Sequence, residues 1–398
     1  MPRLNQILSF IIPVLISMFL GSGIKLVYYE LCPILINDLN YPKLGRIYQL
    51  LFITLSSIST SLYYSIVFLF KSHHKGFSNH DKMYQSFETL VSKKTIVYIA
   101  VDTSGSPKTC EFCDGKIVPL RSRHCLDCKA CITGFDHHCV WYSKCISINY
   151  TLKVFLQSMS ISILSIFIGI IPLFPLVFNH LNLVINLTWN HKILNSIWWD
   201  RPWLSWIGGP SYRYIGAIIL GYTYYSDILE SDSKSTSTRK NQDSIFGKPS
   251  LSALMILFFS IVIILVATSM VAITVRNVVF KGLSTVEIER ARRFERCGGR
   301  VIDGWDPRMK LWIPDGLGMG GGKVILIEPG TPIFDLGPYL NWKQLMGDRV
   351  FEWFVPFVIS NKSDGFQWPI SDKWMKHLQT QKSISEIDKK YSNHVLRK

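Results

Sequence analysis

Long apolar runs dominate the pattern of hydrophobic and polar positions along this chain. Each of the four longest runs comes near the roughly 20 residues that a helix needs to cross about 30 Å of hydrocarbon. They cover residues 6–28, 48–70, 154–178 and 251–275. The first run continues past the length of a signal-peptide core, so we interpret it as a retained span. The pattern predicts an all-α integral membrane protein with four transmembrane helices, kinked where prolines fall inside the first and third runs.

The segments between and after these runs are polar or mixed. Residues 179–250 are predicted to form a luminal loop that ends in a polar linker at 229–250. Within the loop, the apolar stretch Tyr214–Tyr225 is too short for a fifth span, and we expect it to lie in the membrane interface. The tail at 282–398 is rich in tryptophan, and its glycines at 316–321 precede a strand-like stretch at 323–328. A glycine-rich hairpin, not a dinucleotide-binding loop, is therefore predicted there.

Cysteine and histidine crowd into the polar segment between the second and third runs. Seven of the nine cysteines and three histidines lie between Cys110 and Cys145. Two cysteines separated by two residues can place both thiolates on one tetrahedral zinc ion. The ten candidate ligands are Cys110, Cys113, His124, Cys125, Cys128, Cys131, His137, His138, Cys139 and Cys145. The spacing predicts a zinc-binding domain over residues 107–150.

Ten candidate ligands are more than two structural zinc ions need. A closed site takes four ligands, so two sites would leave two side chains over. If these are a cysteine and a histidine beside Asp136, the chain has a thiol nucleophile, a base and a carboxylate that orients the base. Counting alone does not choose the pair. A disulfide framework is disfavoured, because the cysteines are odd in number and histidines stand at ligand spacing.

The stretch Asp136-His137-His138-Cys139, preceded by the spaced cysteines and by Arg121-Ser122-Arg123-His124-Cys125, resembles the DHHC family of protein S-acyltransferases. The resemblance covers residues 107–150 by motif and, more loosely, the membrane layout. It implies two structural zinc ions. One would be held by Cys110, Cys113, His124 and Cys131, and the other by Cys125, Cys128, His138 and Cys145.

The same resemblance implies the roles of the remaining residues. Cys139 would be the nucleophile, His137 the base that takes its proton, Asp136 the orienter of that base, and Trp141 a neighbour of the acyl chain. The implied reaction is ping-pong: Cys139 takes a fatty acyl group, such as palmitate, from acyl-CoA. It then passes the group to cysteine thiols of membrane-associated proteins.

A second family element follows the fourth run. Ser284-Thr285-Val286-Glu287 resembles the T-T-x-E element, which implies docking of the tail near the active site; the same residues also fit an ordinary helix start, with Ser284 as the cap and Glu287 at N3. The chain departs from the family pattern by one extra residue before His124, by Lys144 in place of asparagine and by Ser147 in place of glycine. None of these departures removes a proposed ligand or catalytic residue.

Composition and charge limit the partners. Hydrophobic residues make up 48% of the 398 residues and charged ones 18%, and 43 basic against 28 acidic residues give a net charge of +15. Because this charge is spread over loops between spans, it favours anionic membrane lipid and the phosphates of CoA over nucleic acid. The densest basic patch comes after the fourth run and is either a solvated helix face or a CoA phosphate site. It contains Arg290, Arg292, Arg293 and Arg296.

Four spans place both termini and the zinc domain on one side of the membrane. Zinc thiolates and a reactive cysteine persist best in the reducing cytosol, so we expect that side to be cytosolic, in an endomembrane such as the ER or Golgi. Two other functional classes compete with this interpretation. A catalytically silent zinc scaffold remains the alternative, whereas a transporter is disfavoured because the runs contain almost no ionisable residues.

Overall fold

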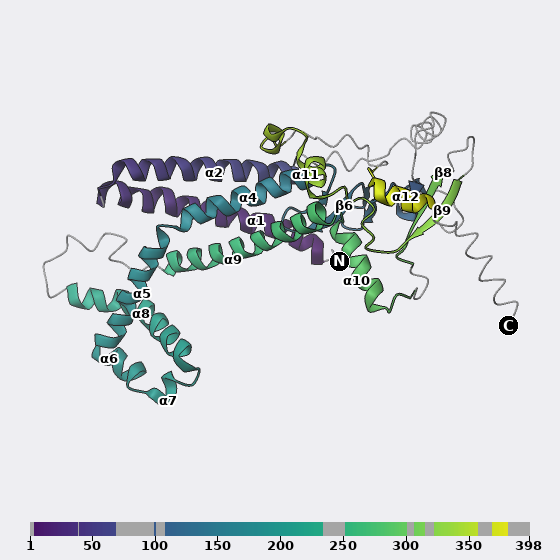
Figure 1. The fold of residues 1–398 in the computed structure, drawn as a ribbon. Coiled ribbons are helices and arrows are strands. Elements are labelled where there is room, and N and C mark those ends of the chain that lie inside the picture. Colours follow the sequence, from purple (N-terminus) through teal and green to yellow (C-terminus); the bar gives the residue numbers. More distant parts are fainter. Residues whose placement is uncertain are drawn as a thin grey trace. The chain divides into compact units, whose positions relative to one another are not determined.

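A computed structural model describes residues 4–38, 40–68, 99–100, 108–233, 251–300, 306–314, 322–356 and 368–380. The chain divides into two compact units whose segments alternate along the sequence (Figure 1). The first, here the cysteine-rich unit, comprises residues 1–16, 60–160 and 269–398. The second, here the helical unit, comprises residues 17–59 and 161–268.

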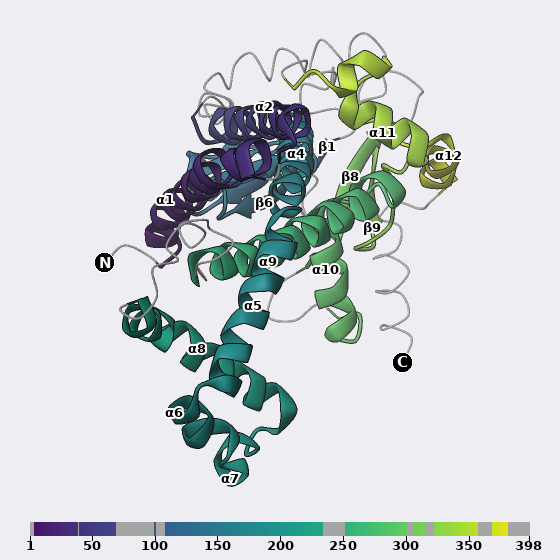
Figure 2. The ribbon, with the colours of Figure 1, turned by 90° about the vertical axis from the view of Figure 1, so that its left-hand side faces the viewer.

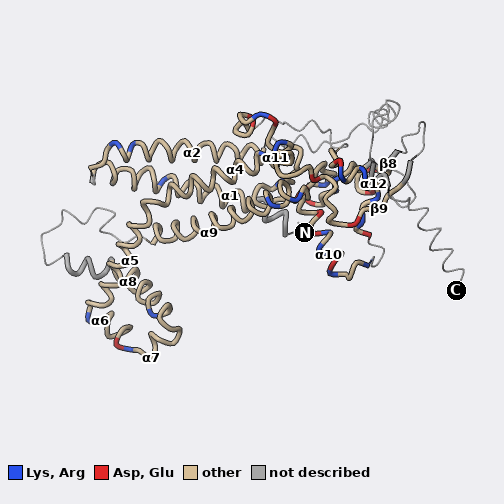
Figure 3. Tube along the Cα trace, in the orientation of Figure 1, with Lys and Arg blue, Asp and Glu red and all other residues tan. Residues whose placement is uncertain are grey.

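Four helices in the described part of the chain are long and apolar enough to span a membrane. The candidate spans are Ile11–Tyr29, Pro42–Phe68, Leu152–Ile170 and Leu251–Phe280. They correspond to α1 (Leu4–Lys25) with the π-helical turn η1 (Leu26–Leu31), α2 (Pro42–Phe68), α4 (Leu152–Ile170), and α9 (Leu251–Thr274) with the π-helical turn η6 (Val275–Phe280). Charged residues stand only near the ends of α1, α2 and α4, and α9 has none (Figure 3). The chain is therefore mostly helical with four candidate membrane spans.

The third helix is shorter than the sequence predicted. The prediction of one span over 154–178 was wrong at its end, because α4 stops at Ile170 and α5 (Leu173–Asn190) begins after Pro172. Proline has no N–H to donate and its ring crowds the preceding turn, so Pro172 stands at a helix boundary as the N-cap of α5. Pro13, by contrast, lies inside α1.

The predicted luminal segment is largely helical over residues 179–233, and its luminal placement stays a prediction. After α5 come α6 (Lys192–Leu194), the π-helical turn η5 (Asn195–Trp199), α7 (Pro202–Ser205) and α8 (Gly209–Ser233); the remainder of the predicted linker, 234–250, lies outside the described residues. Tyr214–Tyr225 lies in α8, which packs on α5. At Gly221 an added Cβ would stand 2.7 Å from the carbonyl oxygen of Val184, so glycine permits this close approach. Figure 2 shows the two helices from a second side.

The helical unit has an apolar core formed by residues of η1, α2, α4, α5 and α9. Buried members include Leu31, Phe52, Leu173 and Leu257. Paired hydroxyls also join α2 to α4: Ser56 Oγ lies 2.9 Å from Ser165 Oγ, and Ser59 Oγ lies 2.6 Å from Ser162 Oγ. Such pairs satisfy polar groups that would otherwise face hydrocarbon.

The cysteine-rich unit is built on three short antiparallel hairpins. They are β2 (Thr109–Cys110) with β3 (Lys116–Ile117), β4 (Arg123–Cys125) with β5 (Ala130–Ile132), and β6 (Phe135–Cys139) with β7 (Lys144–Ser147). The residues at their turns adopt positive φ: Asp114 at 54°, Lys129 at 51° and Ser143 at 54°. Strands of two to five residues bury little apolar surface, which indicates that something other than a hydrophobic core stabilises these three hairpins.

The tail adds a sheet and helices to the same unit. β1 (Ile99–Ala100), β8 (Met309–Pro314) and β9 (Gly322–Ile327) form an antiparallel sheet, and the antiparallel pairing of β8 with β9 confirms the predicted strand hairpin; residues 315–321 lie outside the described residues. Helices α10 (Thr285–Arg296), α11 (Pro338–Met346) and α12 (Asp372–Thr380) and the 3-10 turn η7 (Val350–Trp353) complete it. Buried Asn341 donates to the carbonyl of Val279 (2.8 Å) and thereby joins α11 to η6.

Candidate active site

Two groups of four side chains converge in the cysteine-rich unit. They are Cys110, Cys113, His124 and Cys131, and Cys125, Cys128, His138 and Cys145, and within each group the ligand atoms lie within 4.8 Å of one another. These are the two sets that the resemblance implies.

The donor atoms of both groups fit a tetrahedral zinc ion. Two thiolates on zinc, with Zn–S bonds of about 2.3 Å, stand about 3.8 Å apart. Cys113 and Cys131 Sγ are 3.7 Å apart, and Cys128 and Cys145 Sγ are 3.4 Å apart. His138 Nδ1 lies 3.5 Å from each of its three cysteine partners. Both groups can therefore hold zinc, and no other group of this kind is found among the described residues.

Strand geometry separates the two neighbouring histidines. Successive side chains of a strand point to opposite faces, so in β6 His137 and Cys139 share one face and His138 takes the other. His138 pairs in register with Cys145 on β7, a member of its metal group, and Cys139 pairs with Lys144. The register shifts between Phe135 and His137, which makes Asp136 the extra residue of a β-bulge. A bulge redirects a side chain.

Asp136, His137 and Cys139 lie together outside both metal groups. The fully buried Asp136 carboxylate accepts a 2.8 Å hydrogen bond at Oδ2 from His137 Nδ1. His137 Nε2 is buried and has no hydrogen-bond partner in the described part of the chain. Burial alone would lower the pKa of His137, but the hydrogen bond to Asp136 and the negative charges of Asp136 and Cys139 outweigh it and raise that pKa to about 9. The ring can therefore hold a proton at neutral pH beside the Cys139 thiol.

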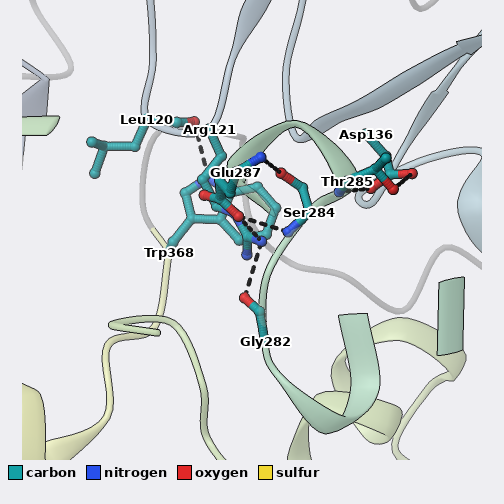
Figure 4. Close-up of polar contacts among 8 residues, drawn as sticks. All are labelled: Leu120, Arg121, Asp136, Gly282, Ser284, Thr285, Glu287 and Trp368. Atoms are coloured by element: carbon teal, nitrogen blue, oxygen red, sulfur yellow. Dashed lines mark hydrogen bonds and ion pairs between the residues drawn. The ribbon is translucent and has the colours of Figure 1, made fainter. Parts of the chain in front are cut away.

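The start of α10 fixes the other side of Asp136 (Figure 4). The backbone N–H of Thr285 donates to Asp136 Oδ1 (2.6 Å), and Thr285 Oγ1 donates to Asp136 Oδ2 (3.0 Å). Ser284 and Glu287 form a capping box at the same helix end, as the sequence predicted. Both oxygens of the carboxylate are thus bound by groups that hold its position.

Arg121 binds the capping box from the cysteine-rich hairpins. One guanidinium nitrogen donates to Glu287 Oε2 (2.8 Å) and to the carbonyl oxygen of Gly282 (3.1 Å). Both charged side chains are largely buried, at 4% exposure for Arg121 and 11% for Glu287. A buried ion pair tolerates little displacement of either partner, because a lost partner leaves an uncompensated charge.

Aromatic side chains pack around Cys139, which is only 2% exposed. Tyr63 donates to the carbonyl oxygen of Trp141 (2.9 Å), and its ring lies 5.0 Å from that of Tyr142. Phe155 of α4 contacts the His137 ring edge-to-face, with centroids 5.8 Å apart. Trp141, two residues beyond the cysteine, is 41% exposed. The thiol therefore lies in a mostly apolar setting, with an exposed indole nearby.

A pocket with basic walls lies beside these hairpins. Its charged lining residues are Lys108, Arg121, Arg123, Arg290 and Glu287. Arg290 comes from α10, and its pKa is lowered by burial and by repulsion from Arg123. Glu287 pairs with Arg121. An anion bound in the pocket would stabilise the other cations, Lys108, Arg123 and Arg290.

Residues 103–231 match the family model described as DHHC palmitoyltransferase. These residues form a DHHC palmitoyltransferase domain. The chain shares 41% identity over 64 residues with palmitoyltransferase akr1 of Emericella nidulans, which is 16% of this chain and 8% of that protein. With human palmitoyltransferase ZDHHC17 the identity is 35% over 112 residues, 28% of this chain and 15% of that protein. With human palmitoyltransferase ZDHHC15 it is 27% over 174 residues, 40% of this chain and 50% of that protein. The chain thus spans half or less of the length of these relatives.

Three contacts of the DHHC domain were not predicted from the sequence. Arg121 belonged to the motif but had no assigned partner, and Tyr63 was one apolar position in a span. Trp368, which binds Leu120 and Arg121, was one tryptophan among several in the tail. Spacing in the sequence gives no signal for such contacts, because each joins segments far apart in the chain.

Proposed function

We propose that this protein is a membrane-bound protein S-acyltransferase that uses Cys139 as its nucleophile. The observation that carries the proposal is the Asp136–His137 hydrogen bond beside a cysteine that belongs to neither metal group. A thiol, a base and a carboxylate that holds the base are the parts that covalent acyl transfer through cysteine needs.

In the first half-reaction His137 takes the Cys139 proton and the thiolate attacks the thioester carbon of a fatty acyl-CoA. The bond to the CoA sulfur breaks, and His137 returns the proton to the departing CoA thiolate. In the second half-reaction the thiol of a membrane-associated protein loses its proton to His137 and attacks the thioester carbon of acyl-Cys139. The bond from that carbon to Cys139 Sγ breaks, and His137 returns the proton to Cys139, which restores the enzyme. Asp136 keeps Nδ1 protonated, so that Nε2 is the atom that exchanges protons.

Zinc fits the two metal groups as a structural ion. Each group offers four protein donors, which leaves no open position of the kind that catalytic zinc keeps for water. When bound, the ions would cross-link the three hairpins and so hold the strand that carries His137 and Cys139. This agrees with how little apolar surface the short strands bury.

The basic pocket supports acyl-CoA as the donor, since CoA carries several phosphates. Arg290→Ala and Arg123→Ala should raise KM for palmitoyl-CoA about tenfold and leave kcat little changed. Arg292→Ala, on an exposed part of the same helix, is the matched control. A KM that does not move in the first two variants would remove this pocket from the proposal.

The exposed Trp141 and the four candidate spans suggest an acyl chain held at the membrane. We propose that Trp141 contacts that chain and that the zinc domain and both termini face the cytosol of an endomembrane. The substrates proposed are cytosolic cysteines of membrane-associated proteins. Protease protection of sealed vesicles, with antibodies to each terminus, tests the orientation.

Purified protein incubated with labelled palmitoyl-CoA tests the function itself. A hydroxylamine-sensitive label is expected on the wild type and on Cys297→Ser, whose cysteine lies in neither metal group. Cys139→Ser should carry no label while it retains two zinc ions per chain. The alternative, a catalytically silent zinc scaffold, predicts no label on any of the three proteins.

A further inference from the structure

Arg121 has an unusual environment for a cation. Its backbone lies in the left-handed region at φ 56°, which is unfavourable for a non-glycine residue. Its Nε is buried and has no hydrogen-bond partner among the described residues. Such a conformation persists only where the surroundings impose it.

Two aromatic rings from the tail supply that environment. The guanidinium carbon lies 4.7 Å from the Trp368 ring and 4.8 Å from the Phe334 ring. Trp368 is 2% exposed, and its Nε1 donates to the carbonyl oxygen of Leu120 (3.2 Å), the residue before Arg121. A cation over an aromatic face is attracted by the electron density of the ring, and more strongly when water is excluded. Trp368 therefore contributes to the position of both the backbone and the charge at this point.

The contacts of Arg121 lead directly to the acid–base pair. Arg121 binds Glu287 and Gly282 at the start of α10, and Thr285 on the first turn of α10 binds both oxygens of Asp136. Asp136 in turn holds His137. Figure 4 shows this series of contacts from Trp368 to Asp136. The Arg121 backbone joins it too, since its carbonyl oxygen accepts from the N–H of Phe135 (2.9 Å), next to Asp136.

We propose that Trp368 is a positioning residue for acyl transfer: by holding Arg121 it keeps the first turn of α10, and through it Asp136 and His137, in place for reaction at Cys139. The proposal rests on the proposed function. Trp368 touches neither the acyl donor nor the reacting sulfur, so its loss should slow the chemical step without weakening donor binding. Misplacement of a reacting group by a fraction of an ångström to 1 Å is enough to slow such a step.

Rapid-mixing measurement of acyl-enzyme formation with labelled palmitoyl-CoA separates positioning from folding. The burst amplitude counts competent active sites, and the burst rate constant reports their chemistry. For Trp368→Leu we expect a rate constant about tenfold below wild type, with full amplitude, unchanged KM for palmitoyl-CoA and two zinc ions per chain. Trp368→Phe retains an aromatic face for Arg121 and should restore the rate to within about twofold of wild type.

Two further proteins complete the test. Trp374→Leu changes a half-buried tryptophan of α12 whose ring packs on His377, and it should match wild type. In Arg121→Lys, which loses the planar group that Trp368 covers, the added Trp368→Leu should slow the reaction less than twofold, because both changes act on one contact.

The outcomes differ in what they overturn. A wild type that forms no acyl-enzyme ends the proposed function. A wild type with a normal burst overturns only the present inference if Trp368→Leu keeps the wild-type rate, or if it loses amplitude or zinc while its remaining sites react at the wild-type rate. A rate in Trp368→Phe as slow as in Trp368→Leu also overturns it.

Discussion

Two adjacent histidines of one short strand have unrelated partners. His138 Nδ1 faces three cysteine sulfurs, whereas His137 Nδ1 binds a carboxylate. The alternation of side chains along a strand is sufficient to separate the two environments. Histidine thus faces a candidate metal group at position 138 and binds a carboxylate at position 137.

This difference predicts two distinct defects. His138→Ala should lower zinc content by about one ion per chain and destabilise the protein, because it removes a proposed ligand of a structural site. His137→Ala should retain both ions and slow acyl-enzyme formation by about 10²–10⁴-fold, because it removes the proposed general base. Metal analysis and burst kinetics on the same preparations measure both effects. Equal zinc loss in the two variants would contradict the assignment.

At the scale of single residues, the sequence predicted which residues belong to the candidate site better than it predicted the contacts between them. The ten cysteines and histidines and Asp136 were recognisable because their spacing is local and resembles a known pattern. The partners of Asp136 on α10, and the rings around Arg121, could not be read in this way. They depend on how segments more than 140 residues apart pack together, as the separations of 149 for Thr285–Asp136 and 248 for Trp368–Leu120 show.

Among the helices and strands, α10 contacts the candidate site through its first turn, which binds Asp136. The capping box gives that turn a defined shape, and two hydrogen bonds from Thr285 connect it to a buried carboxylate. The sequence allowed two interpretations of residues 284–287, a helix start or a docking element. The two are the same structure, because the capped first turn presents the donors to Asp136.

Thr285→Val tests this connection with little change in shape. It removes the hydroxyl bond to Asp136 and leaves the backbone bond. A hydrogen bond to a charged group contributes about 1.5–3 kcal/mol, so the acylation rate should fall by about tenfold or more. Thr188→Val, which removes a buried hydroxyl that binds Trp199 in the helical unit, is the matched control and should leave the rate unchanged. Equal rates for Thr285→Val and wild type would mean that the hydroxyl does not hold Asp136.

The turn before α10 depends on a glycine. Gly282 has φ +62°, and an added Cβ would lie 2.6 Å from Asp335 Cα, whereas Gly298, at φ +66°, has open space around it. Gly298→Ala should therefore cost only the left-handed backbone term, about 1–2 kcal/mol. Gly282→Ala adds a backbone clash and should lower the apparent Tm further and slow acylation. Similar melting curves for the two variants would show that the turn can shift to accept the methyl group.

Element boundaries were predicted less well than element existence. All four long helices were expected from hydropathy, but the third ends at Ile170 because Pro172 interrupts it, and the helices within 179–233 were not predicted. Mean hydropathy reports only that a segment is apolar. It does not register how α5 and α8 pack on each other through close contacts such as Gly221 on Val184.

At the scale of the whole molecule, membrane residence and acyl chemistry favour each other. Burial of an acyl chain contributes about 0.8 kcal/mol per CH₂, so a palmitoyl group remains largely at the bilayer before and after transfer. A chain with four candidate spans remains there as well.

The division into two units predicts a local response to metal removal. Treatment of the detergent-solubilised full chain with a strong zinc chelator should abolish acylation and increase amide exchange over residues 108–150 and 285–296. Residues 173–225 should keep their protection, because the helical unit contains no candidate metal group among its described residues. Hydrogen–deuterium exchange with mass spectrometry measures this, and a uniform loss of protection would show that the units unfold together.

The position of Trp368 in the sequence affects when a newly made molecule can begin to work. Its partner Leu120 precedes it by 248 residues, an interval that a ribosome needs roughly 12–50 s to translate at 5–20 residues per second. The hairpins that carry the metal groups can fold during that interval, but Trp368, which contacts Arg121, has not yet been made. If Trp368 has the proposed role, a nascent chain would have its thiol in place but react slowly until Trp368 has been made and has packed on Arg121.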